Sequence, residues 1–446
     1  MKSLFISVIL FPAFCFAQEA KRESIALTVY NNDLGVVRDV RSFDLTKGQS
    51  QIRLVDVPAQ IDATSVKITA LKHPQNFEVL EQNFEYDLIS QEKILNKFID
   101  KPITLTNDKG ERIEGTLLAS QHLQVSLSSP SGILLIPNIS QYRISVPNLP
   151  GGLITRPTLL WDVTSSTTLS NEPLEVLYQT SGISWHAEYI ASLSDDEKSI
   201  DLTGWASIDN KCGATFENAR VKLVAGDVNA VTPQPTIRRK TFAMMAADET
   251  ASVQERILAE YHLYDLGRST TIKDNEIKQL SLLNASNITA TKHYTYHGDK
   301  NVEVTYDVMN STTNNLGMPL PAGTIRMMKK DKDGTSQFIG EDRITHTPRD
   351  EKITIKTGNA FDLLGERTVT ESKNNEHSTR QTIVLLVKNR KKESVTIDAI
   401  ENVGGNAEII KSSMEYEKKN ANEIIFHVPV SAGSVQKVEF TVLQTW

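Results

Sequence analysis

The clearest strand pattern in this 446-residue chain is the run Thr382-Ile383-Val384-Leu385-Leu386-Val387. It is apolar, rich in β-branched residues and too short for an ordinary helix, so it predicts a buried strand. Similar runs occur through about the last hundred residues, at 353–355, 368–370, 395–397, 407–410, 424–428 and 438–442. Short strands with a turn about every 8 to 12 residues are typical of a two-layered β fold. We therefore expect an immunoglobulin-like β-sandwich over residues 350–446.

The segments before the sandwich are also β-rich, with one helix among them. Short strand-like runs separated by Asn, Asp and Gly turns predict an N-terminal β domain over residues 18–88. From residue 88 to 99 apolar side chains recur with the period of a helix, which Pro102 ends. Five short strand-like runs follow, and strands of this length can close into a small barrel. We expect a helix plus an SH3-like barrel segment over 89–147; the alternative is a meander that continues the first domain.

Residues 148–349 resume the long β runs, with one break in the pattern. Residues 229–258 combine Thr232-Pro233-Gln234-Pro235, the basic triplet Arg238-Arg239-Lys240 and a tract of small residues. This composition predicts a long, flexible, exposed loop within a β-rich domain. The whole chain is thus predicted to be all-β and multidomain.

The start of the chain has the features of an export signal. Lys2 precedes an apolar run from Leu4 to Phe16, and Cys15 and Ala17 occupy the −3 and −1 positions of a cleavage site. This run is shorter than the about 20 residues that span a bilayer, and no later run reaches that length. We expect residues 1–17 to be a signal peptide. The mature chain should be periplasmic or extracellular and should have no transmembrane segment.

Composition limits the partners and the means of stabilisation. Lys and Arg number 48 against 55 Asp and Glu, a net charge of -7, so no basic excess is present to bind nucleic acid. Once residues 1–17 are removed, Cys212 is the single remaining cysteine. Burial rather than disulfides must then stabilise the exported chain. Cys212 lies in a turn-like stretch, and nothing in the sequence supports its pairing with His186 as a nucleophile.

Several stretches after residue 148 carry a family resemblance. They are Leu149-Pro150-Gly151-Gly152-Leu153, Arg156-Pro157-Thr158-Leu159, Gly182-Ile183-Ser184-Trp185-His186-Ala187-Glu188-Tyr189, Gly204-Trp205, Asn210 with Gly213, Lys222-Leu223-Val224-Ala225-Gly226-Asp227, Leu320-Pro321-Ala322-Gly323 and Ile339-Gly340-Glu341-Asp342. Through them the region from about 148 to 446 resembles an exported bacterial family of unknown function, some of whose members are labelled mucoidy inhibitor A-like. Residues 25–70 are similar, more weakly, to the β domain that often precedes it. The resemblance implies a β-rich fold and export, and it supplies no catalytic residues.

One pair of motifs is typical of enzymes. Ser90-Gln91-Glu92-Lys93 and Lys356-Thr357-Gly358 match the S-x-x-K and K-T-G motifs of penicillin-recognising enzymes. The middle S-D-N-type element should precede K-T-G, yet its nearest match, Ser372-Lys373-Asn374, follows it. The large helical domain of those enzymes also has no counterpart in this β-rich sequence. A helix-capping Ser and a strand-to-turn Lys-Thr-Gly are the better interpretation.

Metal and cofactor signatures are missing from the sequence. His293 and His297 lie in a strand-like run, where four residues span about 13 Å, too far for one ion. Asp331-Lys332-Asp333-Gly334 resembles part of a calcium loop, but Gly340 stands where the twelfth position needs an acid. A charged hairpin turn fits that segment better. No G-x-S-x-G, Walker or dinucleotide-binding motif occurs, so we expect neither a metal nor a cofactor.

Two sets of residues leave enzymatic activity open. Acids that are distant in sequence can converge in the fold, as glycosidase carboxylates do, and the candidates are Glu188, Asp227, Glu341 and Asp342. Aromatic side chains can line a glycan groove, although buried Trp residues are commoner in sandwiches; the candidates are Trp161, Trp185 and Trp205. No pattern assigns a catalytic residue.

The sequence favours an exported, non-enzymatic envelope protein. Its modules would bind an envelope or periplasmic protein through loops and sheet edges. The alternative is a periplasmic hydrolase of glycan or peptide, with carboxylates or a His assembled by the fold. The identity of the partner and the oligomeric state do not follow from the sequence.

Overall fold

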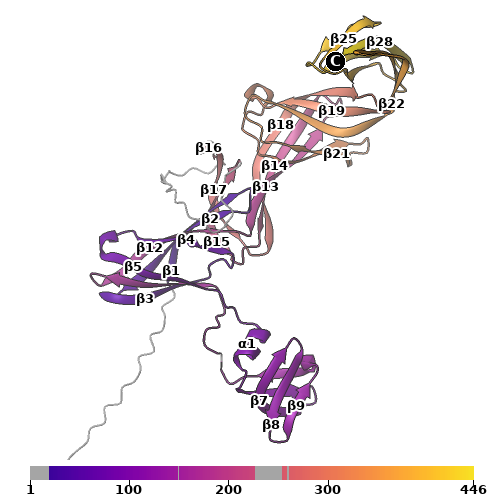
Figure 1. The fold of residues 1–446 in the computed structure, drawn as a ribbon. Coiled ribbons are helices and arrows are strands. Elements are labelled where there is room, and N and C mark those ends of the chain that lie inside the picture. Colours follow the sequence, from indigo (N-terminus) through magenta and orange to yellow (C-terminus); the bar gives the residue numbers. More distant parts are fainter. Residues whose placement is uncertain (1–19, 149, 227–253, 259–260) are drawn as a thin grey trace, which may run out of the picture.

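The computed structural model describes residues 20–148, 150–226, 254–258 and 261–446. The export signal expected over 1–17 and most of the loop expected over 229–258 lie outside these residues. Strands make up most of the structure, and the described part contains one α-helix, α1 (Gln91–Lys97) (Figure 1). Three short 3-10 helices occur at Pro74–Asn76, Ile139–Gln141 and Thr312–Asn314. The predicted all-β, multidomain fold is confirmed.

Two sheets of the N-terminal part share one core. The larger sheet has the order β16-β17-β15-β1-β2-β12-β4, with β1 (Lys21–Tyr30), β2 (Gly35–Leu45), β4 (Ile61–Ala70), β12 (Leu169–Thr180), β15 (Phe216–Ala225), β16 (Gln254–Leu258) and β17 (Tyr261–Ile272). The smaller sheet has the order β3-β11-β5, with β3 (Gly48–Val55), β5 (Phe77–Glu85) and β11 (Thr158–Ser165). Because β1 pairs in parallel with β15 and β2 pairs with β12, residues 18–88 share a sheet with later strands rather than standing apart.

A second large sheet extends from this core to the C-terminal end. It runs β21-β20-β13-β14-β18-β19-β22-β23-β28-β25, with β13 (Ile183–Leu193), β14 (Ser199–Asn210), β18 (Glu276–Tyr296), β19 (Asn301–Met309), β20 (Gly323–Lys330), β21 (Ser336–Ile344), β22 (Lys352–Asn375), β23 (Ser378–Asn389), β25 (Ala407–Ser412) and β28 (Val435–Thr445). Strands β18 and β22 are 21 and 24 residues long and enter two cores. They connect the middle of the molecule to its C-terminal end (Figure 1).

The C-terminal end is a two-layered β structure. Strands β24 (Val395–Asn402), β26 (Glu417–Lys418) and β27 (Glu423–Val430) form the layer opposite β23 and β28. The rings of Phe426 and Phe440 lie 5.2 Å apart between the layers. Tyr294 and Tyr296 of β18 also belong to this core, so the sandwich expected over 350–446 additionally uses an earlier strand.

A small module with its own core is inserted between β5 and β11. It consists of α1 and one antiparallel sheet of order β10-β6-β7-β8-β9, with β6 (Pro102–Asn107), β7 (Arg112–Gln121), β8 (Gln124–Ser129), β9 (Gly132–Ile136) and β10 (Tyr142–Ser145). The five expected strands are present, but the sheet stays open because β10 pairs with β6 and β9 is the other edge. Figure 1 shows the module beside the main body, attached through two neighbouring chain segments.

Candidate protein-interaction surface

The structure separates the penicillin-type motifs. Ser90 precedes α1, and its Oγ accepts a hydrogen bond from the backbone N–H of Lys93 at 3.2 Å, as a helix cap does. Lys356 lies on β22 and contacts Glu303. Helix α1 and β22 lie in different parts of the molecule (Figure 1). The two motifs therefore do not share a site.

The structure shows the surroundings of Cys212, His186 and His293. Cys212 is fully buried, and burial raises the pKa of its thiol to about 12, so it is not a thiolate at neutral pH. His186 is exposed and contacts Glu188 at 3.1 Å. His293 lies on β18 between Asp307 and Asp398, at 3.6 and 3.9 Å. In the part of the chain that the structure describes, no group of three or more His, Cys, Asp or Glu side chains could hold a metal ion.

Two of the candidate acids are brought together, with a cation between them. Arg326 of β20 contacts Glu188 of β13, and its Nε lies 3.3 Å from a carboxylate oxygen of Glu341 on β21. The hydrogen bond to Glu188 raises the pKa of Arg326. Asp342 instead accepts the backbone N–H of Lys356 at 2.8 Å, and Asp227 lies outside the described residues. This arrangement ties three adjacent strands together and offers no unpaired acid for proton transfer.

The tryptophans divide between core and surface. Trp161 and Trp185 are fully buried, and their indole N–H groups donate to Gln82 and to the Val224 carbonyl at 2.8 and 2.9 Å. Trp205 is partly exposed on β14. Two of the three are thus core residues with satisfied hydrogen bonds, as Trp residues of β folds usually are.

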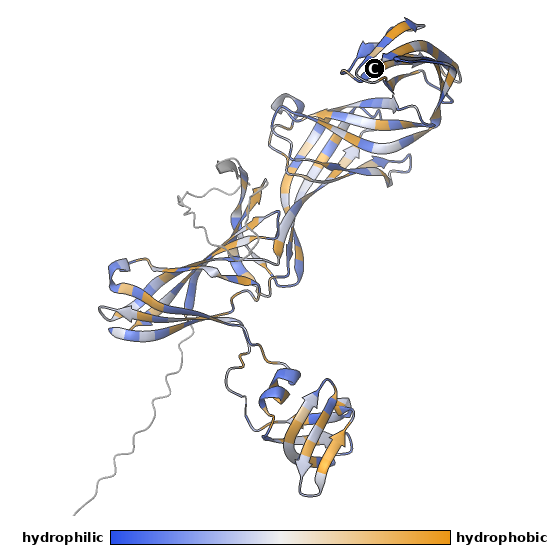
Figure 2. Ribbon diagram, viewed as in Figure 1, coloured by the Kyte–Doolittle hydropathy of each residue, from blue (hydrophilic) through white to orange (hydrophobic). Residues whose placement is uncertain are grey.

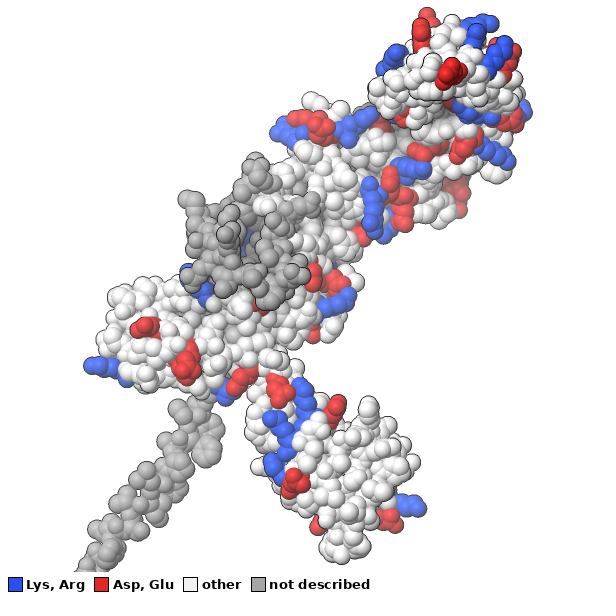
Figure 3. Space-filling view, in the orientation of Figure 1, with Lys and Arg blue, Asp and Glu red and all other residues white. Residues whose placement is uncertain are grey.

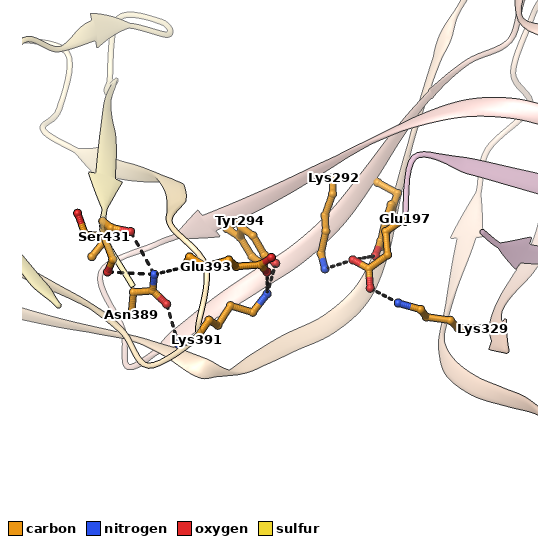
Figure 4. A network of polar contacts seen from close by, with 10 residues as sticks. Glu197, Lys292, Tyr294, Lys329, Asn389, Lys391, Glu393 and Ser431 are labelled. Atoms are coloured by element: carbon orange, nitrogen blue, oxygen red, sulfur yellow. Dashed lines mark hydrogen bonds and ion pairs between the residues drawn. The ribbon is translucent and has the colours of Figure 1, made fainter. Parts of the chain in front are cut away.

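A further polar network links the middle of the molecule to the C-terminal core. Glu197, in the β13–β14 turn, contacts Lys292 of β18 and Lys329 of β20 (Figure 4). Lys391 donates to the Tyr294 hydroxyl at 2.6 Å and to Glu393 at 3.0 Å. Each of these charges has a partner of opposite sign or an aromatic face beside it, which is what a structural network requires.

The inserted module has a surface of different character. No Asp, Glu, Lys or Arg occurs from Gly115 to Tyr142, although such residues make up 23% of the chain. This uncharged segment contains β8, β9 and most of β7. In Figure 3 the end of the module that carries these strands is mostly white, and charged side chains gather near α1. Figure 2 shows hydrophobic residues along the module's strands.

Strand β9 exposes two large apolar side chains on one face. Val125 and Leu127 of β8 are buried in the module's core, and Ile136 of β9 is also buried. Since side chains alternate along a strand, Ile133 and Leu135 point to the opposite face, where they are 67% and 75% exposed. An exposed apolar pair on a strand is a feature of binding surfaces.

The backbone of β9 is also available for pairing. A two-residue turn, Pro130-Ser131, joins β8 to β9 and places Ser129 opposite Gly132 in a hydrogen-bonded pair. Because hydrogen-bonded and non-hydrogen-bonded pairs alternate along an antiparallel ladder, the N–H and C=O groups of Ile133 and Leu135 point away from β8. We call Gly132–Ile136, with these outward groups, the β9 edge.

The β9 edge lacks the features that usually protect edge strands. Charged side chains, prolines and bulges prevent edges from pairing with other chains. Within the described residues every other edge strand contains a charged residue: β3, β4, β5, β10, β16, β21, β25 and β26. β9 contains none, and its register with β8 is regular. The β9 edge is therefore the strongest candidate site for pairing with another strand.

Sequence patterns predicted β9 as a strand but not as a site. Two features of the sequence point to it, namely the long uncharged run and the four consecutive apolar residues Ile133-Leu134-Leu135-Ile136. A strand with one solvated face would instead alternate. That β9 lies at an edge follows from the sheet order, which periodicity does not reveal.

Comparison with known proteins identifies a family whose function is unknown. Residues 174–446 match the model of a domain of unknown function, DUF4139. No curated protein matches the chain. The described residues contain no helix long and apolar enough to cross a membrane. The inserted module and its β9 edge lie before the matched residues.

Proposed function

We propose that this chain, which belongs to the DUF4139 family of unknown function, is an exported, non-enzymatic protein of the cell envelope. It pairs with a strand of another polypeptide chain at the β9 edge. The mucoidy inhibitor A-like proteins, whose motifs its sequence resembles, are its proposed relatives.

The β9 edge carries this proposal. A strand that pairs there would satisfy the outward backbone groups of Ile133 and Leu135 and remove both side chains from water. Full burial of one such side chain is worth about 1.5–3 kcal/mol. The uncharged segment around the edge lets an apolar strand approach without desolvating a charge.

Export is supported by the first seventeen residues and by cysteine usage. A charged start, an apolar run and small residues near Ala17 form a signal-peptide pattern. The one cysteine after this segment, Cys212, is buried and unpaired, so exposure to an oxidising compartment would leave it unchanged. The hydrolase alternative has no comparable support, because Glu188 and Glu341 share Arg326.

Site-specific photo-crosslinking of the full chain tests the proposal. We place a photoreactive residue at position 133 and express the chain with its own first seventeen residues. We expect a discrete adduct in the cell envelope. Leu135→Pro should abolish it, because proline removes an N–H that points outward and leaves the hydrogen bonds to β8 intact.

Position 190 provides the control. Ile190 is 42% exposed, but it lies on β13 between β14 and β20, which pair with it on both sides. A photoreactive residue there should give no discrete adduct. Absence of an adduct from position 133, or an adduct that Leu135→Pro leaves unchanged, would refute strand addition at β9.

A further inference from the structure

We infer that the strand that pairs with the β9 edge is β9 of a second copy of this chain, so that two copies form a two-fold symmetric dimer. The inference rests on the proposed function, since it names the occupant of the same edge. It follows from the register of β8 and β9, the order of the exposed side chains and the absence of charge.

The outward backbone groups of β9 are complementary to themselves. In an antiparallel pairing centred on Leu134, Ile133 of one copy lies opposite Leu135 of the other, and the reverse pair forms by symmetry. These are the two residues whose N–H and C=O groups point away from β8. Each pair can therefore exchange both of its backbone hydrogen bonds. No shift of register or bulge is needed.

The side chains fit the same register. Ile133 and Leu135 of both copies would meet on one face and cover each other, which removes the exposed apolar surface of each monomer. Gly132, which has no side chain, would lie opposite Ile136 of the second copy. In the next row, the outer positions of β8 are Ser126 and Ser128, so no like charges approach each other.

Strand β9 of a second copy fits the β9 edge better than β10, the module's other edge strand, would. Pairing of β9 with β10 of another copy would bring the exposed Arg143 against the uncharged segment. Such a contact is also heterologous, and it would continue from copy to copy. The β9–β9 pairing uses the same surface on both copies and stops at two. Because it is smaller than a standard interface of about 1,600 Å², we expect a dissociation constant on the order of micromolar.

Cysteine trapping tests the register. Opposite residues of a non-hydrogen-bonded pair have Cα atoms about 4.5 Å apart, within the range of a disulfide. Leu134 would face its own counterpart in such a pair, whereas Ile133 would be offset from its counterpart by two residues, at more than about 7 Å. We therefore expect mild oxidation to link Leu134→Cys into a covalent dimer, and to link Ile133→Cys far less. Cys212 should not compete, because it is fully buried.

Sedimentation of the mature full chain tests the association itself. We expect a concentration-dependent dimer whose dissociation constant rises at least about tenfold in Leu135→Pro, because that variant removes one backbone donor from each symmetric pair. Ile190→Thr should dimerise as the parent does. Circular dichroism of both variants checks that they are folded.

The outcomes separate the inference from the proposed function. A monomeric chain whose position 133 crosslinks to a different protein would overturn the inference and leave strand addition at β9 standing. Equal disulfide formation by Ile133→Cys and Leu134→Cys would also overturn it, since random collision has no register. Failure of every crosslink at position 133 would refute both the β9–β9 dimer and strand addition at the β9 edge. A dimeric adduct together with selective trapping at position 134 would support both.

Discussion

Glu197 shows how a single carboxylate links a turn to two strands. It lies in the β13–β14 turn with a left-handed backbone (φ 59°) and contacts Lys292 and Lys329. Burial raises the pKa of Glu197, but the hydrogen bonds from the two lysines outweigh burial and lower it to about 2. The unfolded chain titrates near the ordinary value of 4.5. Because the pKa of Glu197 is lower in the folded chain than in the unfolded chain, Glu197 stabilises the fold at pH values above the unfolded pKa. This stabilisation is lost as the pH falls toward 2.

We therefore expect Glu197→Gln to lower the free energy of unfolding by about 1 kcal/mol at pH 7, after discounting for solvent screening. The difference between variant and parent should shrink from about pH 5 downward and vanish near pH 2. Urea unfolding across this pH range measures it. Glu393→Gln is the control, since Glu393 is an exposed acid that contacts one lysine (Figure 4). A difference that does not change with pH would contradict the assigned role.

Strand β22 shows what sequence patterns can and cannot predict. The runs 353–355 and 368–370 predict two strands, and Gly358 and Asn359 between them are typical turn residues. The structure has one strand, in which the pairing with β19 shifts register near these residues. A bulge and a turn use the same residue types, so the local sequence does not distinguish them. The pairing with β19 determines that a bulge forms here instead of a turn.

Two side chains of β22 close to this bulge differ in exposure. Leu363 is fully buried in the C-terminal core, whereas Phe361, two residues earlier, is 95% exposed. Leu363→Ala should lower the free energy of unfolding by about 2–5 kcal/mol, through lost burial and the cavity that it leaves. Phe361→Ala should change it by less than about 0.5 kcal/mol. Urea denaturation of the two variants measures both values, and equal losses would contradict the buried position of Leu363 and the exposed position of Phe361.

In the inserted module, the sequence predicts the strands but not the way in which they pair. Each strand of the inserted module could be predicted, because its apolar runs and turns are local. The openness of the sheet could not, because it depends on β10 pairing with β6 across the whole module. The β9 edge follows from that topology and from the chemistry of all the other edge strands. The uncharged run can be read from the sequence, but the position of β9 at the edge of the sheet cannot.

The matched family segment is not a structural unit on its own. Its strands β12 and β15 have β2 and β1 as sheet neighbours, and these lie more than one hundred residues earlier. A chain of residues 174–446 alone would expose those edges. The inserted module, in contrast, is a structural unit, because it has its own core although it interrupts the sequence of the main body.

This contrast gives a prediction for deletions. Strands β5 and β11 are paired, with Glu85 directly opposite Thr158, so a short Asn-Gly turn could join them after removal of residues 87–156. We expect this variant to remain folded, with the same urea midpoint for the remaining sheets, because their core contains no residue of the module. Deletion of residues 21–45 should instead abolish folding, since it removes β1 and β2 from the centre of a sheet. Circular dichroism and urea unfolding compare the two. Loss of folding in the first variant would mean that the module stabilises the body to which it is attached, and β9 would then have a structural role beyond recognition.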